Sequence, residues 1–265
     1  MANTAAQTYV GATGPAGATG AAGASGSTTY AGSLASSSSV AVSSGNQTYL
    51  LTGTTGVTTV TGGTSGSILT LIASGQATGV CVVLNNGGSS NNLSLRDSAN
   101  LGIYAGESVT FVYNGTYWVE IARDLRKVLS YNFAEASGLI TSTTVAGGNT
   151  LATASSITFD GATPIVITLY LYQWATGSTA NSAVFANLWD GATAKHRVAY
   201  LSNSAVTSQQ ALTLFTQVRL TPTAAARAYS IRAFRATSNG EWNTTDNPSG
   251  TGDNGQGFIR IERDI

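Results

Sequence analysis

Apolar residues recur at every second position along several short segments in the second half of the chain. The clearest alternation covers residues 165–172, with Ile165, Ile167, Leu169 and Leu171 in one set and Val166, Thr168, Tyr170 and Tyr172 in the other. Successive side chains of a strand point to opposite faces, so both faces of this strand are predicted to be covered. A strand with two covered faces suits a trimer in which one sheet meets its copies at the threefold axis. We therefore predict Tyr170 and Tyr172 at that contact.

Further strands are predicted from similar short apolar segments separated by turn residues. They cover residues 156–159, 184–189, 197–201, 212–220, 229–235 and 257–262. Seven or eight strands with turn signals between them are typical of a β-sandwich or jelly roll. We assign residues 130–265 to this C-terminal β-sandwich.

Residues 29–122 also carry short apolar runs, separated by clusters of glycine, asparagine and serine, and they predict a β-rich shaft module. The clearest element is a hairpin over residues 109–121 that turns on Asn114 and Gly115. Both residue types accept the positive φ that a tight two-residue turn requires.

That two-residue turn sets the expected register of the hairpin. It pairs Phe111 with Trp118 on one face and Val112 with Tyr117 on the other. Aromatic residues on both faces indicate that one face packs within the chain and the other against a neighbouring chain. Phe111 and Trp118 are therefore further candidates for a trimer contact.

Charged residues concentrate between these two modules, in the segment 123–129 with the preceding Glu120. Ile121, Leu125 and Val128 keep helical spacing across it. The pattern predicts a charged neck, either a short helix or a joint between domains. Acidic and basic residues alternate, which disfavours a nucleic-acid patch.

A glycine falls at every third position near the N-terminus, at Gly11, Gly14, Gly17, Gly20, Gly23 and Gly26. A collagen triple helix tolerates only glycine at its crowded axis and requires three chains. Residues 11–28 therefore predict a collagen-like stalk in a homotrimer, and a flexible linker is the alternative interpretation. The preceding residues 1–10 are predicted to be a docking peptide, with Tyr9 and Val10 as its anchors.

Composition narrows the choice of partners and of cellular compartment. Charged residues make up 9% of the chain and the formal net charge is zero, so no basic excess favours nucleic-acid binding. No segment has the apolar length that a membrane span needs, and the N-terminus lacks a signal-peptide pattern. The lone Cys81 is expected to be buried, and the protein to be made in a cytoplasm.

The sequence offers little catalytic chemistry, and we predict a protein that is not an enzyme and needs no cofactor. Hydrolysis of a polysaccharide requires two paired carboxylates, whereas the 12 acidic residues are scattered without a motif. A polysaccharide depolymerase is therefore the less favoured hypothesis. His196, the only histidine, is expected at the surface near the end of a strand.

The segment 238–256 is the strongest candidate for binding. Trp242 lies there among amides, hydroxyls and carboxylates, which suits a sugar whose apolar face covers the ring. We take Trp242, Asn243, Asp246 and Asp253 as candidate contacts with a receptor or sugar. A calcium ion held by the two aspartates and a plain solvated loop are the alternatives.

The glycine triplets and the segment 106–121 resemble those of trimeric collagen-like fibre and minor tail proteins of phages. The C-terminal module is similar in pattern to the jelly rolls of the C1q and tumour-necrosis-factor type, a combination that spore exosporium glycoproteins share. The resemblance implies an all-β homotrimer on a virion that contacts other virion proteins. Host attachment, which includes binding of a surface glycan, is the leading function. Capsid decoration, anchored by residues 1–10, is the alternative.

Overall fold

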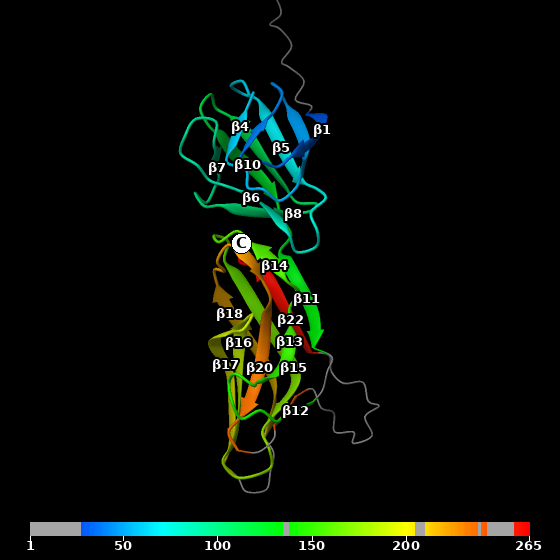
Figure 1. Ribbon diagram of the computed structural model, residues 1–265, viewed down its shortest axis with the longest axis vertical. Helices are drawn as coiled ribbons and strands as arrows, with labels where there is room; N and C mark the ends of the chain where they lie inside the picture. The colour runs from blue at the N-terminus through cyan, green and yellow to red at the C-terminus, as the bar shows by residue number, and fades with distance from the viewer. Residues whose placement is uncertain (1–27, 135–137, 205–209, 238–239, 243–256) are drawn as a thin grey trace, which may run out of the picture.

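The computed structural model describes residues 28–134, 138–204, 210–237, 240–242 and 257–265. Strands and connecting loops make up the described chain, and no helix occurs in these ranges. The fold consists of two β modules placed end to end along the long axis (Figure 1). We call residues 29–124 the first module and residues 128–265 the second module.

In the first module the chain winds so that successive strands stack in parallel, and a hairpin closes the stack. In its main sheet, β1, β3 and β5 run parallel, β9 and β10 pair antiparallel, and β7 lies at the edge. Thr29 pairs with Gln47, and Gln47 pairs with Leu69, so each turn of the winding chain takes about 20 residues. The strands are β1 (Thr29–Ala35), β2 (Ser39–Ala41), β3 (Gln47–Thr52), β4 (Thr59–Thr61), β5 (Ile68–Ala73), β6 (Cys81–Leu84), β7 (Leu93–Ser94), β8 (Leu101–Tyr104), β9 (Ser108–Tyr113) and β10 (Trp118–Asp124).

Trp118 is among the largest side chains in the core of the first module. Its side chain is fully buried, and its indole N–H donates to the carbonyl of Val60 at 2.9 Å. A Cβ atom on Gly63 would lie 2.3 Å from the Trp118 ring, so only glycine fits beside it. This large buried aromatic residue therefore has a partner for its polar group.

Eight long strands of the second module form two antiparallel sheets. Sheet I has the order β11 (Val128–Ala134), β22 (Gly257–Arg263), β15 (Ile165–Ala175) and β18 (Ala211–Leu220). Sheet II has the order β13 (Asn149–Thr153), β20 (Tyr229–Arg235), β16 (Ser182–Asp190) and β17 (Thr193–Asn203). Counted along the chain, the orders are 1-8-3-6 and 2-7-4-5, which is the strand order of a jelly roll.

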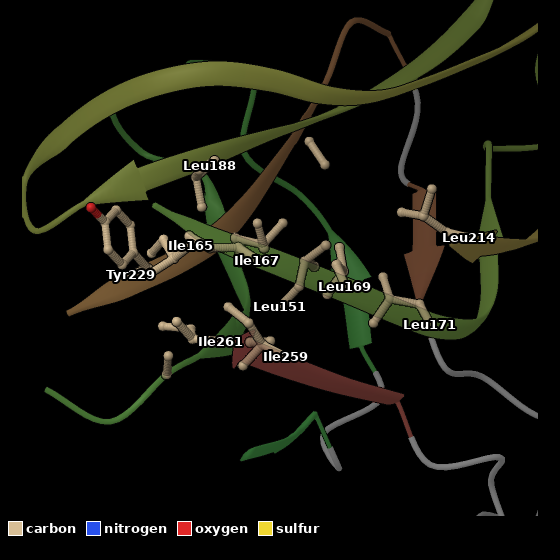
Figure 2. Packing of buried hydrophobic residues seen from close by; sticks show 14 of the residues in the cluster. Leu151, Ile165, Ile167, Leu169, Leu171, Leu188, Leu214, Tyr229, Ile259 and Ile261 are labelled. Carbon is tan, nitrogen blue, oxygen red and sulfur yellow. The ribbon is translucent and has the colours of Figure 1, made fainter. Parts of the chain in front are cut away.

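The core of the second module lies between these two sheets. On β15, Ile165, Ile167, Leu169 and Leu171 are all buried and face sheet II, where they meet Leu188 (Figure 2). Ile259 and Ile261 of β22 extend the same layer. The predicted alternation along β15 thus supplies one complete wall of the core.

Four short strands complete the second module. The strands β14 (Ile157–Phe159) and β19 (Ala225–Arg227) pair with each other, and β21 (Gly240–Trp242) joins β12 (Gly138–Ile140) to the end of β15. β12 lies at the end of the module far from the first module, whereas β14 lies near it (Figure 1).

The hairpin of the first module has a different register from the predicted one. Trp118 pairs with Tyr113 and Glu120 with Phe111, so the loop has four residues instead of two. The Asn114 side chain explains the longer loop, because its oxygen accepts the backbone N–H groups of Thr116 and Tyr117 at 2.9 and 2.7 Å. The predicted pairing of Phe111 with Trp118 was wrong.

The charged neck is shorter than predicted and extended. β10 continues to Asp124 and β11 begins at Val128, which leaves three residues between the modules. The helical alternative was wrong, because Arg123 and Arg126 reach carboxylates of the first module instead of packing along a helix. Tertiary ion pairs override the apolar spacing here.

Most predicted strands of the second module are confirmed within a few residues. The predicted strands at 184–189, 197–201, 212–220, 229–235 and 257–262 correspond to β16, β17, β18, β20 and β22. The structure confirms an all-β chain over the described residues.

Candidate binding surfaces

A buried ion pair joins the two modules. Glu107 of the first module and Arg263 of the second are 3% and 2% exposed, and two parallel hydrogen bonds of 2.9 Å connect them. Arg263 also donates to the carbonyls of Gly102 and Arg126 at 2.7 and 3.0 Å. A paired and fully hydrogen-bonded buried charge fixes geometry, so this contact holds the modules in one orientation.

Backbone and side-chain hydrogen bonds surround this ion pair at the junction. The Asp160 carboxylate accepts the N–H of Gly102 at 2.7 Å, and the Tyr104 hydroxyl donates to the carbonyl of Thr158 at 2.7 Å. Burial, with a smaller contribution from Asp160, raises the pKa of the Cys81 thiol to about 12. Burial also raises the pKa of Tyr104 above its ordinary value. Cys81 is therefore a buried, protonated thiol, as predicted.

An aromatic row crosses the outer face of sheet I. Phe133 of β11 pairs with Phe258 of β22, Phe258 pairs with Tyr170 of β15, and Tyr170 pairs with Phe215 of β18. The Tyr170 and Phe258 rings stack at 5.5 Å, and Tyr131 stacks on Phe258 at 5.1 Å. We call this surface the aromatic face; it consists of Tyr131, Phe133, Tyr170, Tyr172, Phe215 and Phe258.

Large parts of the aromatic face are exposed in the single chain. Phe133 is 51% exposed, Tyr172 50% and Phe215 60%. Charges near these rings are paired, because Arg260 contacts Glu262 at 3.0 Å and Arg219 contacts Asp264. A contiguous, exposed and charge-balanced aromatic surface is typical of a protein–protein interface.

The predicted trimer contacts fall into two groups. Tyr170 and Tyr172 lie on the outer side of β15, within the aromatic face. Phe111 and Trp118 are fully buried in the core of the first module, so they have no surface for another chain to contact. Their assignment to a trimer contact was wrong, because the hairpin has one inward aromatic face that the rest of the module covers.

Several predicted sites lie outside the described residues. They include the glycine triplets, Tyr9 and Val10, and the loop residues Asn243, Asp246 and Asp253. The backbone of Trp242 is described and forms part of β21, where it pairs with Trp174 of β15 and Gly138 of β12. These assignments remain predictions.

Several acidic residues among the described ranges have structural partners. Glu120 pairs with Arg123, whose pKa is raised chiefly by that hydrogen bond, and Asp190 pairs with Arg227 at 2.6 Å. Over the described ranges, no group of three metal-ligating side chains occurs. No helix suited to crossing a membrane is present there. His196 is exposed within β17.

Comparisons with known proteins identify no family. No protein-family model matches the sequence, and no curated protein matches it. Two solved structures of infectious bursal disease virus, the Gx and Gt strains, align with 62% of this chain at 14% and 12% identity, with TM-scores of 0.31 and 0.28. The aligned parts are 48% and 44% of those chains, so this chain spans less than half of each.

Three members of the aromatic row were not predicted from the sequence: Phe133, Phe215 and Phe258. Phe215 and Phe258 lie inside predicted strands, but their alignment depends on pairing between segments up to 125 positions apart, from 133 to 258. The available signal was an aromatic residue at an outward position on each of several strands. That signal cannot specify which residues are neighbours until the strand order is known.

Proposed function

We propose that the protein is a non-enzymatic virion fibre protein that forms a homotrimer and attaches the particle to a host surface. The observation that carries the proposal is the aromatic face of sheet I. It exposes an apolar surface four strands wide in one chain, and the glycine triplets in the sequence match the pattern of a triple helix, which is built from three chains. Three copies would cover these faces at the threefold axis.

The arrangement of the modules supports a fibre. The two modules follow one another along the long axis, and the junction between them is fixed by the buried Glu107–Arg263 pair (Figure 1). β12 lies at the end remote from the first module and pairs with β21, which contains Trp242. We infer that this remote end faces the host and that the N-terminal stalk faces the particle.

The roles of the acidic residues support a protein without enzymatic activity. Glu107, Glu120, Asp160 and Asp190 each have structural partners, through Arg263, Arg123, the Gly102 N–H and Arg227. A hydrolase needs a carboxylate free to exchange protons with substrate. These four described carboxylates are engaged in structure, which supports our proposal that the protein binds a ligand and does not catalyse a reaction.

Competition for attachment tests the proposal. Host cells incubated with the purified full-length protein should lose the ability to adsorb the virus, in proportion to the protein concentration. Gold-labelled antibody should mark the fibre on intact particles. Undiminished adsorption at saturating protein, with label on the capsid shell, would support capsid decoration and overturn the attachment function.

A further inference from the structure

The outer face of sheet II carries two adjacent rows of side chains with different chemistry. In the first row, Asn187 of β16 pairs with Arg197 of β17 and Arg232 of β20. In the second row, Phe185, which lies two residues before Asn187 on β16, pairs with Tyr200 and Phe234. Residues two apart on a strand share a face, so the cationic row and the aromatic row lie side by side. We call these six residues the basic face.

Aromatic rings hold both arginines in place. The guanidinium of Arg197 lies over Phe185, 4.7 Å from the ring centre, and that of Arg232 lies over Trp189 at 4.5 Å. Arg232 donates one hydrogen bond, to the carbonyl of Gly191 at 3.0 Å. Guanidinium groups fixed on rings in this way lose little further freedom when they bind an anion.

Positive charge on sheet II is not balanced by acidic residues. All twelve lysines and arginines are described, and seven of them form ion pairs with described acids. Of the remaining five, four lie on β17 and β20: Lys195, Arg197, Arg232 and Arg235. Asp190 is the only acid in the sequence of the four strands, and it is paired with Arg227. The face is thus complementary to a negative ligand.

Three polar atoms beside the two rows lack hydrogen-bond partners among the described residues. They are Oδ1 of Asn187, Nε of Arg232 and Nε1 of Trp189. Asn187 is 8% exposed and Trp189 is 5% exposed. Two of these atoms are donors and one is an acceptor, so polar groups with unused hydrogen-bonding capacity lie beneath the face.

A hollow of about 210 Å³ adjoins the aromatic row. Its lining includes Asn181, Tyr200, Ser202 and Ser204, which provide amide and hydroxyl groups. Tyr200 is 57% exposed, and its ring belongs both to the hollow and to the aromatic row. An exposed ring next to amides and hydroxyls is the arrangement that binds the apolar face and the hydroxyls of a sugar.

We propose that the basic face of sheet II binds an acidic saccharide. Arg197, which lies over Phe185 beside Tyr200, binds one anionic group, and Arg232, which lies over Trp189 further along β16, binds a second. Tyr200 stacks on a sugar ring, and the hollow receives neighbouring hydroxyls. This inference rests on the proposed attachment function, because it names the class of host-surface ligand. It places that ligand on sheet II, in addition to the predicted site at Trp242.

The test uses the full-length protein on an array of acidic glycans, with carboxylated, sulfated and phosphorylated members, each printed beside its neutral counterpart. We expect binding to acidic glycans at least about tenfold above the neutral counterparts. Polyglutamate serves as an anion without sugar rings and should bind at least about tenfold more weakly than the best glycan. Equal binding to neutral glycans, equal binding to polyglutamate, or no binding to any acidic glycan would overturn the proposal.

Variants locate the site. R197Q with R232Q should weaken binding to the best glycan at least about tenfold, and Tyr200→Ser alone about threefold to tenfold. R219Q is the matched control, because it removes an exposed arginine that is paired with Asp264 on sheet I, and it should bind as the native protein does. The thermal unfolding midpoint of each variant establishes that it is folded. Unchanged binding by a folded double variant would contradict the proposal.

The outcomes also separate this inference from the attachment function. If the protein blocks virus adsorption but shows no preference for acidic glycans, attachment stands and the basic face is not its receptor site. If the protein neither blocks adsorption nor binds glycans, both proposals are contradicted.

Discussion

The two sheets of the jelly roll share a core but present different outer faces. Sheet I exposes an aromatic row, and its Arg260 and Arg219 are each paired with a carboxylate. Sheet II also has an aromatic row, but its Arg197 and Arg232 lie over Phe185 and Trp189 and have no acidic partner among the described residues. Strand alternation fixes which residues point outward on both sheets, so the difference comes only from which residues occupy those positions.

This difference indicates what each face binds. An aromatic face with paired charges can be covered by copies of itself without burying an unpaired charge. A face with unpaired arginines would bring like charges together in such a contact, so it suits an acidic partner. We therefore propose self-association through sheet I and ligand binding through sheet II.

The largest expected effect comes from Glu107→Ala at the junction, which holds both faces in a fixed orientation to the first module. The substitution leaves Arg263 buried without its carboxylate, and we expect a loss of about 3–5 kcal/mol in the free energy of unfolding. Denaturant unfolding of the full-length protein measures this loss.

Glu262→Gln provides the matched control for the junction. It breaks the pair with Arg260 of sheet I, and the Arg260 side chain is 33% exposed. The substitution should lower the free energy of unfolding by no more than about 1 kcal/mol. Equal losses for the two variants would show that the junction is not a special contact.

Salt should affect the two faces differently. Raising sodium chloride from 50 to 500 mM should weaken binding of an acidic glycan to sheet II about tenfold, because mobile ions screen exposed charges. Dissociation of the trimer should change less than about threefold, since apolar contacts are not screened. Titrations and sedimentation at both salt concentrations measure the two effects. A trimer that dissociates at high salt would assign the charged face to self-association.

At neutral pH one further contribution is not seen: it comes from the interior that supports both faces, and it changes only at alkaline pH. Burial raises the pKa of Cys81 from 9.0 to about 12. Burial, with a smaller contribution from Asp190, raises the pKa of Tyr229 from 10.0 to about 12. The unfolded chain releases these protons first. The stability that these two groups contribute is therefore fully present below about pH 9, and this contribution is lost as the pH rises from 9 to 12.

Thermal unfolding midpoints from pH 7 to 11 measure this dependence. Cys81→Ala removes one of the titrating groups and should reduce the decline between pH 9 and 10. A native Cys81 that iodoacetamide alkylates at pH 8 as quickly as in denaturant would contradict its burial.

The sequence was sufficient to predict six of the eight long strands of the second module, but not β11 or β13 and not how distant strands meet. Alternation predicted both faces of β15, and short apolar runs predicted β16, β18, β20 and β22. The hairpin register failed because the side chain of Asn114 stabilises a four-residue loop. The helical alternative for the neck failed because its charged residues have partners in the first module.

The candidate surfaces were less predictable than the strands. Tyr170 was identified from its outward position, but the row that it forms with Phe215 and Phe258 depends on long-range register. The rows on sheet II depend on the pairing of β16 with both β17 and β20. Local patterns specify which side of a strand a residue occupies, whereas strand order and register specify its neighbours.

Sedimentation equilibrium of two matched variants tests the central claim, that sheet I binds copies of the chain and sheet II does not. Phe215 and Tyr200 are exposed aromatic residues, 60% and 57% exposed, on sheets I and II respectively. The native protein and Tyr200→Glu should have a mass of about 81 kDa, three times the chain mass of 26.9 kDa, and Phe215→Glu should have the mass of one chain. A native protein of 26.9 kDa, or a trimer that Tyr200→Glu dissociates and Phe215→Glu leaves intact, would contradict the account.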